Sequence, residues 1–274
     1  TFFCYRERLL KTSAHFRWQG AVHECIAPRG NIRYGDAAVT HRKPPCAYSD
    51  RNLKIYENLL AKGEKLDARG SYYYARELLA HKRYAQAVEA FEAFLAMPDG
   101  WTENKIDACL GLSQALTALG EHEQAKRALT LSFALEVPRS AVCCAFAALE
   151  YADNRARQAV FWYETAIRAA RTAPHGFIDV NACAYAPDTG STDKTREIAA
   201  QYGTVQVFPW CDDFSAARNF SFAQARMDYT LWLDADDVLL PSDRQKLLAL
   251  KAELDGTADV VMLPYHTGFD EQGR

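Results

Sequence analysis

Three carboxylates stand close together near the end of the chain, directly after an apolar run. Asp234, Asp236 and Asp237 follow Tyr229-Thr-Leu-Trp-Leu233, whose composition predicts a buried strand. Crowded carboxylates repel one another and are costly to desolvate unless a cation joins them. Such oxygen ligands suit Mg²⁺ or Mn²⁺, which commonly bridge to substrate phosphates. The alternative interpretation is a polar turn that caps a helix at Pro241, because Asp is favoured at helix caps.

A second acidic turn, Asp188-Thr-Gly-Ser-Thr-Asp193, precedes this cluster, and Ala217-Arg218-Asn219 lies between the two. The surrounding sequence alternates between helical and strand patterns. Helices are predicted over 193–202, 214–225 and 244–254, and strands over 205–208, 229–233 and 259–263. Strands that alternate with helices predict a parallel, doubly wound sheet.

Composition sets limits on what these motifs can belong to. The 274 residues are 49% hydrophobic and 24% charged, with a net charge of −3, as in ordinary soluble proteins. This charge argues against a general nucleic-acid binder, and no apolar run approaches the roughly 20 residues that span a bilayer. No secretory signal opens the chain, and eight scattered cysteines lack Cys-x-x-Cys pairing. We therefore expect reduced thiols, no zinc site and a cytoplasmic protein.

The middle of the chain, from about residue 50 to 171, is rich in Ala, Leu and Glu and predicts three helix pairs. Ala87, Ala125 and Ala159 occupy matching places in the second helix of each pair, and a proline follows each helix. Spacings of about 34 to 40 residues are typical of tetratricopeptide repeats, which this region resembles. Such repeats stack into a concave surface that usually holds a protein or peptide. A plain helical bundle is the alternative interpretation.

The two acidic turns and the stretch Phe208-Pro-Trp-Cys-Asp-Asp-Phe-Ser-Ala-Ala-Arg-Asn-Phe-Ser221 together resemble family 2 glycosyltransferases of the GT-A fold, in particular a bacterial branch that carries tetratricopeptide repeats. The resemblance implies an α/β, Rossmann-like nucleotide-sugar domain beside an all-α repeat domain. It also covers Phe16-Arg-Trp-Gln-Gly-Ala-Val-His-Glu24, which is similar to the segment that follows the transferase sheet.

The resemblance implies a set of metal ligands and a base. Asp236, helped by Asp234 and His23, is expected to hold Mn²⁺ or Mg²⁺. Glu24 is the expected catalytic base, with Asp237 as the second candidate. A partly buried histidine with satisfied hydrogen bonds is the alternative for His23.

Contacts to the nucleotide sugar are also implied by the resemblance. Asp188 and Asp193 would contact the base and ribose, Arg218 the phosphate, and Asp234 the donor together with the metal. Ser191 is included in this set. Capping of the following helix is the alternative role for Ser191 and Asp193.

The order of the segments differs from that of the family. The second part of the transferase domain is expected at 1–44, the repeats at 45–187, and the first part at 188–274. The chain is thus circularly permuted, or segments have been joined out of order, or the domain is completed between chains. The opening strand and helix of the family, which should precede Asp188, have no counterpart in the sequence.

These observations predict a metal-dependent inverting glycosyltransferase. Its donor would be a nucleotide-diphosphate sugar such as a UDP-sugar, and its acceptor a peptide or protein held by the repeats. A non-catalytic repeat scaffold that binds a protein partner is the alternative, favoured by the absent opening strand. A nucleotidyltransferase fits less well, because no Gly-rich phosphate loop with a Lys appears.

Overall fold

The chain folds into two compact units, here called the α/β unit and the repeat unit. A computed structural model describes residues 2–41, 49–172, 208–234 and 236–267. Residues 1–49 and 186–274 form the α/β unit, and residues 50–185 form the repeat unit. The α/β unit therefore joins segments from both ends of the sequence.

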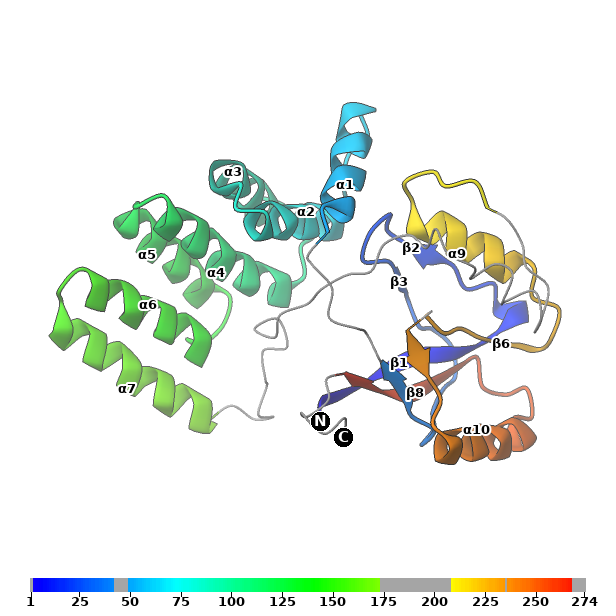
Figure 1. The fold of residues 1–274 in the computed structure, drawn as a ribbon. Helices are drawn as coiled ribbons and strands as arrows, with labels where there is room; N and C mark the ends of the chain where they lie inside the picture. The colour runs from blue at the N-terminus through cyan, green and yellow to red at the C-terminus, as the bar shows by residue number, and fades with distance from the viewer. Residues whose placement is uncertain (1, 42–48, 173–207, 235, 268–274) are drawn as a thin grey trace. The chain divides into compact units, whose positions relative to one another are not determined.

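The repeat unit consists of helices (Figure 1). Its helices are α1 (Arg51–Ala61), α2 (Ala68–Ala80), α3 (Tyr84–Leu95), α4 (Thr102–Ala118), α5 (His122–Leu131), α6 (Ser140–Ala152) and α7 (Ala156–Thr172). A short 3₁₀ turn over Ser132–Ala134 follows α5. The three predicted pairs are confirmed as α2 with α3, α4 with α5, and α6 with α7.

Small residues at the helix contacts let the backbones of the repeat unit approach closely. Ala87 and Ala125 are fully buried and Ala159 is nearly so, as their matching places predicted. Gly111 in α4 faces Phe91 of α3, where a Cβ atom would lie 2.5 Å from the ring. Because real Cβ contacts are never that short, only glycine lets α4 pass Phe91 at this distance.

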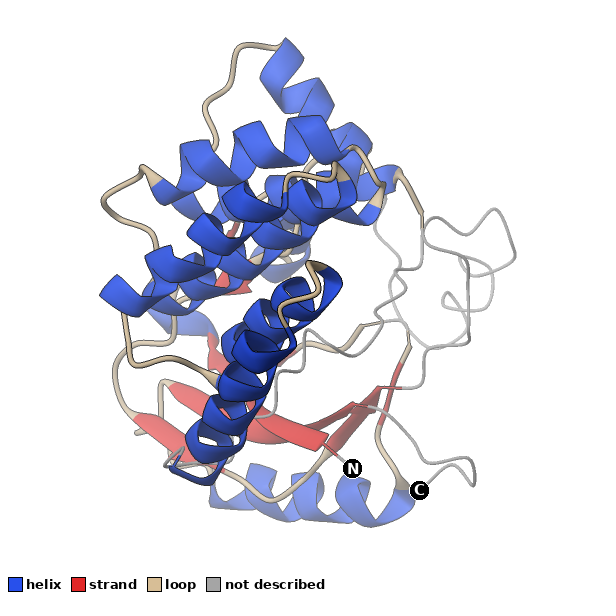
Figure 2. Ribbon diagram, turned by 90° about the vertical axis from the view of Figure 1, so that its left-hand side faces the viewer, coloured by secondary structure: helices blue, strands red, loops and turns tan. Residues whose placement is uncertain are grey.

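The α/β unit contains one mixed sheet, a small second sheet and two described helices. Its elements are β1 (Phe2–Lys11), a 3₁₀ turn (Thr12–Ala14), β2 (Trp18–Gln19), β3 (Cys25–Ile26), β4 (Ile32–Tyr34), β5 (Val39–His41), α9 (Phe214–Ala223), β6 (Tyr229–Leu231), β7 (Asp237–Val238), α10 (Pro241–Glu253) and β8 (Val260–Thr267). Helix α10 lies along one face of the sheet (Figure 2). Its Leu250 packs there with Leu9, Val261 and Leu263.

The main sheet has the order β6-β1-β8-β5-β7, with β4 also paired to β8. Strand β1 is antiparallel to both β6 and β8, whereas β4 and β5 run parallel to β8. The prediction of a parallel, doubly wound sheet is therefore wrong for the described strands, which form a mixed sheet. The α/β fold class and the helical repeat domain are confirmed.

The turn residues Gly35-Asp36 predict a short hairpin over residues 31–41, and this prediction is wrong. Strands β4 and β5 do not pair with each other but lie one after the other along β8, opposite Val260–Met262 and Tyr265–His266. Both are short, so each is stabilised by the long neighbouring strand rather than by a local turn. This arrangement carries His41 to the end of β5, beside β7.

Part of the sequence prediction lies outside the described residues. This is true of the turn at 188–193, the helix at 193–202, residues 205–207 of the predicted strand, and the linker that Lys43-Pro-Pro45 predicts. The assignment of 1–44 and 188–274 to two parts of a transferase domain stays a prediction. Among the described helices, none is both long and apolar enough to cross a membrane.

Candidate functional site

The acidic loop after β6 is held in place by a buried arginine. Arg8 of β1 donates hydrogen bonds to the Trp232 carbonyl oxygen at 3.3 Å and to Asp237 Oδ2 at 2.7 Å. Its guanidinium lies 3.9 Å from the centroid of the Trp232 ring and 4.4 Å from that of Tyr265. The positive charge therefore rests between two aromatic faces and neutralises one carboxylate of the loop.

Asp237 is the most buried carboxylate of the loop, with no exposed side-chain area. Burial alone raises the pKa of Asp237, but the His41 ring, the backbone N–H of Asp234 and the charge of Arg8 outweigh it, so the pKa lies below its usual value. Asp234 N–H donates to Asp237 Oδ2 at 2.9 Å. Asp237 thus shapes the turn as an ionised carboxylate.

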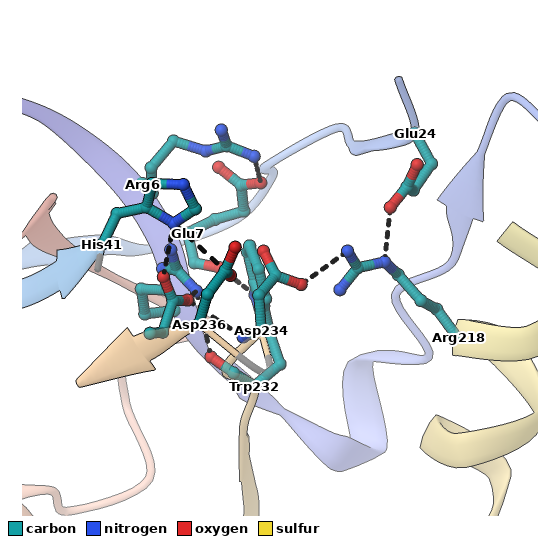
Figure 3. A network of polar contacts seen from close by, with 10 residues as sticks. Arg6, Glu7, Glu24, His41, Arg218, Trp232, Asp234 and Asp236 are labelled. Carbon is teal, nitrogen blue, oxygen red and sulfur yellow. Dashed lines mark hydrogen bonds and ion pairs between the residues drawn. The ribbon is translucent and has the colours of Figure 1, made fainter. Parts of the chain in front are cut away.

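His41, Asp236 and Asp237 form a group of potential metal ligands. The ladder between β5 and β7 places His41 directly opposite Asp237. His41 Nδ1 lies 3.4 Å from Asp236 Oδ1 and 3.5 Å from Asp237 Oδ1 (Figure 3). One ligand atom from each residue lies within 4.8 Å of the other two. Each side chain is partly or fully buried, and all three meet at one edge of the sheet.

Two atoms of this group lie 3.5 Å apart, within ion-pair distance, but neither makes a hydrogen bond. His41 Nδ1 and Asp237 Oδ1 are buried and have no hydrogen-bond partner. Buried polar atoms are rarely left so, because an unmade hydrogen bond costs about 1–3 kcal/mol. One imidazole nitrogen and two carboxylate oxygens suit a divalent cation such as Mn²⁺ or Mg²⁺.

A second group lies beside the first and joins the two ends of the chain. Arg218 of α9 donates to Glu24 Oε1 at 2.5 Å and to Asp234 Oδ1 at 2.7 Å (Figure 3). Its guanidinium lies 4.4 Å from the centroid of the Trp18 ring. Burial alone would lower the pKa of Arg218, but the two carboxylates more than offset it, so the pKa is raised. Arg218 therefore stays charged between Glu24 and Asp234.

Helix α9 is positioned so that Arg218 faces this group. The side chain of Asp213 caps the helix by accepting a hydrogen bond from Ala216 N–H at 3.0 Å. Asn219 is fixed at both ends of its amide, which accepts from Trp18 N–H at 2.8 Å and donates to the Trp18 carbonyl oxygen at 3.0 Å. The short β2–β3 sheet is thereby tied to α9, and Glu24 lies in the bend between its two strands.

The structure brings most of the described candidate residues together, but a different histidine from the predicted one lies with the carboxylates. Glu24, Arg218 and Asp234 form one chain of contacts, and Asp236 and Asp237 lie with a histidine. That histidine is His41, which the sequence interpretation did not select. A single His after Val39-Thr40 does not by itself indicate a metal ligand. Its position beside Asp237 follows only from the pairing of β5 with β7.

His23, the predicted histidine ligand, is not part of the ligand group found among the described residues. It is exposed and lies in the bend before β3 with a φ of 53°. Asp188, Ser191 and Asp193 lie outside the described residues. Their expected contacts with a nucleotide stay predictions.

Two comparisons with known proteins found similar sequences. Residues 187–273, about a third of the chain, match the family described as Glycosyl transferase family 2. A TPR repeat-containing protein of Synechococcus elongatus is 50% identical over 54 residues, which are 19% of this chain and 13% of that protein. Residues 187–273 are thus similar to family 2 glycosyltransferases, and a 54-residue stretch of the chain is similar to a TPR repeat-containing protein. Only a small part of the curated relative is spanned.

Several solved structures are similar to part of this chain. A MamA structure aligns over 45% of this chain and 69% of its own, with 17% identity and a TM-score of 0.39. PcrH in complex with the chaperone binding region of PopB aligns over 40% and 85%, with 16% identity and a TM-score of 0.36. The TPR domain of Arabidopsis FLU aligns over 39% and 96%, with 16% identity and a TM-score of 0.35.

Proposed function

We propose that the chain is a metal-dependent, inverting glycosyltransferase that acts in the cytoplasm. It would move a sugar from a nucleotide-diphosphate sugar, such as a UDP-sugar, to an acceptor that includes a peptide or protein. The observation that carries this proposal is the meeting of His41, Asp236 and Asp237 at the edge of the sheet. The match of residues 187–273 to family 2 glycosyltransferases supplies the class of reaction.

The donor set fits a divalent cation. His41 Nδ1 and Asp237 Oδ1 are buried without hydrogen-bond partners, and Asp236 Oδ1 lies beside the histidine. These three residues would hold Mn²⁺ or Mg²⁺, with the expected ligand Asp234 nearby on the same loop. When bound, the ion would neutralise charge on the departing diphosphate as a Lewis acid. Arg8 would keep Asp237 ionised and in position.

Arg218 and Glu24 would have separate roles, in binding phosphate and in accepting a proton. Arg218 carries a fixed positive charge beside the acidic loop, where it would meet a phosphate of the donor in place of a carboxylate. Glu24, once released, would accept the proton of the attacking acceptor, a step worth roughly 10² to 10⁴ in rate. Asp237 fits the role of base less well, because its side chain is fully buried and bonded to Arg8.

Calorimetry with UDP and Mn²⁺, followed by turnover assays with UDP-sugars, tests the proposal. We expect metal-dependent heat and turnover for the unaltered chain, and loss of both in Asp236→Ala. His41→Ala should weaken metal-dependent binding by tenfold or more, by analogy with the loss of other ligand-shell residues. His15→Ala, an exposed histidine away from the ligand group, is the control. Full activity of Asp236→Ala would refute the metal role.

His23→Ala separates the two candidate histidines. If His41 is the ligand, His23→Ala retains metal-dependent UDP binding while His41→Ala loses it. The reverse result would restore the ligand set that the sequence predicted. It would also mean that the β5–β7 pairing does not represent the active arrangement.

A repeat scaffold without catalysis is the second candidate. It is favoured by the 50% identity over 54 residues to a TPR repeat-containing protein. A scaffold would show no metal-dependent heat with UDP and Mn²⁺ in the calorimetry described above. It would also be insensitive to Asp236→Ala in any binding assay with a protein partner.

A further inference from the structure

A second arginine of β1, Arg6, lies over the same two aromatic rings as Arg8. The guanidinium carbon of Arg6 is 5.8 Å from the centroid of the Trp232 ring and 6.0 Å from that of Tyr265. The corresponding distances for Arg8 are 3.9 and 4.4 Å. The side chain of Arg8 is 1% exposed, whereas that of Arg6 is 36% exposed. Strand β1 therefore places two positive charges on one aromatic pair, and solvent reaches the outer one.

The two arginines differ in the anions that balance them. Arg8 donates a hydrogen bond of 2.7 Å to the buried carboxylate of Asp237. The ion pair of Arg6 is with Glu7, its neighbour in the sequence, at 3.7 Å, which is longer than a hydrogen bond (Figure 3). Like charges that share one pair of rings repel each other, so an additional anion would stabilise Arg6 in this position. Its partial exposure leaves it accessible to such an anion.

Arg6 lies beside the group of potential metal ligands. The ring of His41 is 5.9 Å from that of Tyr265, the same ring that the guanidinium of Arg6 approaches. Figure 3 shows Arg6 and His41 on one side of Asp236 and Arg218 on the other. The acidic loop is therefore flanked by two arginines that are partly open to solvent.

The charges at this edge of the sheet favour an anion with more than one negative charge. Arg8 already balances Asp237, so a divalent cation held by the ligand group would face one further carboxylate, that of Asp236. Arg6 and Glu7 balance each other, and the edge would thus keep a net positive charge. A diphosphate fits this charge, and the planar guanidinium of an arginine can bind two phosphate oxygens at once.

We propose that Arg6 binds the terminal phosphate of the donor diphosphate, on the side of the acidic loop opposite Arg218. Because this diphosphate belongs to the nucleotide sugar, the assignment rests on the proposed function. Binding would replace the long contact with Glu7 by hydrogen bonds to phosphate oxygens. The rings of Trp232 and Tyr265 would hold the guanidinium in place for this contact.

Calorimetry of the full chain in the presence of Mn²⁺ tests the proposal, with UDP, UMP and inorganic pyrophosphate as probes. Arg6→Ala should weaken the binding of UDP at least about tenfold, and that of pyrophosphate by a similar factor. Binding of UMP, which lacks the terminal phosphate, should change by less than about twofold. Arg6→Lys keeps the charge but not the planar fork, so it should recover only part of the lost affinity.

Arg33→Ala is the matched control, because Arg33 is 38% exposed and pairs with Glu253 on α10. It should change the affinity for UDP by less than about twofold. Tryptophan fluorescence during denaturant unfolding shows that each variant is folded before binding is compared.

The outcomes separate the role of Arg6 from the proposed function. If the unaltered chain binds UDP with Mn²⁺ and Arg6→Ala binds it equally well, the role of Arg6 is refuted while the proposed function stands. Equal losses for UMP and UDP in Arg6→Ala would show that Arg6 does not act on the terminal phosphate, and would refute it too. An unaltered chain that binds neither UDP nor pyrophosphate with Mn²⁺ would refute both.

Discussion

The repeat unit and the α/β unit each bury a charged cluster, but they complete it differently. In the repeat unit, Lys126 Nζ lies within 3.4 Å of carboxylate oxygens of Glu123, Glu150 and Asp153. In the α/β unit, Asp237 has Arg8 on one oxygen, while its other oxygen faces His41 without a hydrogen bond. The first cluster is completed by lysine and joins two helix pairs. The second keeps two buried atoms, His41 Nδ1 and Asp237 Oδ1, without a hydrogen-bond partner.

The difference predicts that charge removal has different consequences in the two units. In the α/β unit it should affect chemistry, or should unfold the unit where the charge is fully buried. In the repeat unit, apolar packing should dominate stability, and charge removal should have a small, pH-dependent effect. Four substitutions test this, given in order of decreasing effect.

Glu24→Gln is expected to have the largest effect, and only on turnover. The amide keeps a hydrogen-bond acceptor for Arg218 but cannot take up a proton, so turnover should fall by about 10² to 10⁴. Nucleotide binding by calorimetry and the unfolding midpoint should remain nearly unchanged. Glu253→Gln on α10, whose carboxylate is exposed and pairs with Arg33, is the control. A wild-type rate for Glu24→Gln would remove Glu24 as the base.

Arg8→Met should strongly destabilise the α/β unit. The substitution keeps apolar volume between Trp232 and Tyr265 but leaves the buried Asp237 carboxylate without its cation. Breaking a buried pair on one side costs about 3–5 kcal/mol. Denaturant unfolding, followed by tryptophan fluorescence, measures the change in free energy of unfolding. A loss no greater than that of Arg33→Met, an exposed arginine, would show that Asp237 is not held by charge.

Leu129→Ala should destabilise the repeat unit by about 3 kcal/mol. Leu129 is fully buried between helix pairs, so its removal leaves a cavity that rigid neighbours cannot fill. Circular dichroism at 222 nm monitors the loss of helix during urea unfolding. The control is Leu131→Ala, which removes the same atoms from a side chain that is 52% exposed and should change stability by less than about 0.5 kcal/mol. Equal effects of the two would mean that packing does not dominate this unit.

The repeat unit was largely predictable from the sequence because its contacts are local. Helical periodicity and the matching residues Ala87, Ala125 and Ala159 were enough to place three pairs, and the structure confirms them. Each pair packs on the next in chain order, so no distant pairing had to be known. The exposure of Val160, Tyr163 and Ile167 on α7 was not predicted. An apolar residue at a stacking position has the same sequence pattern whether or not a neighbouring helix covers it.

The α/β unit was predictable in its acidic residues but not in its sheet. Carboxylates crowded after a strand indicated that a cation must lie near them, but the sequence could not show that Arg8 supplies one. Strand β1 pairs with β8 from the other end of the chain, and β5 pairs with β7. Pairings between strands so far apart in the sequence cannot be read from local patterns, because nothing local fixes which strands pair or in which register. The sequence around His41 therefore gave no indication that this residue lies at the candidate site.

Asp153→Asn should have the smallest effect, confined to acid. His122 and then Lys126 donate hydrogen bonds to the Asp153 carboxylate and lower its pKa from 3.8 to about 2. A carboxylate whose pKa is lower in the folded state stabilises the fold above its unfolded pKa, and this stabilisation disappears as pH falls from about 4 to about 2. Thermal unfolding of the helices between pH 7 and 2 should therefore show a drop in melting temperature over that window.

In Asp153→Asn the melting temperature should be slightly lower at pH 7 and should fall less steeply between pH 4 and 2. Asp99→Asn, which removes an exposed carboxylate between α3 and α4, is the control and should keep the full acid dependence. If Asp153→Asn keeps it too, the acid sensitivity of the repeat unit arises from other carboxylates. The Lys126 cluster would then contribute little to the stability of the repeat unit.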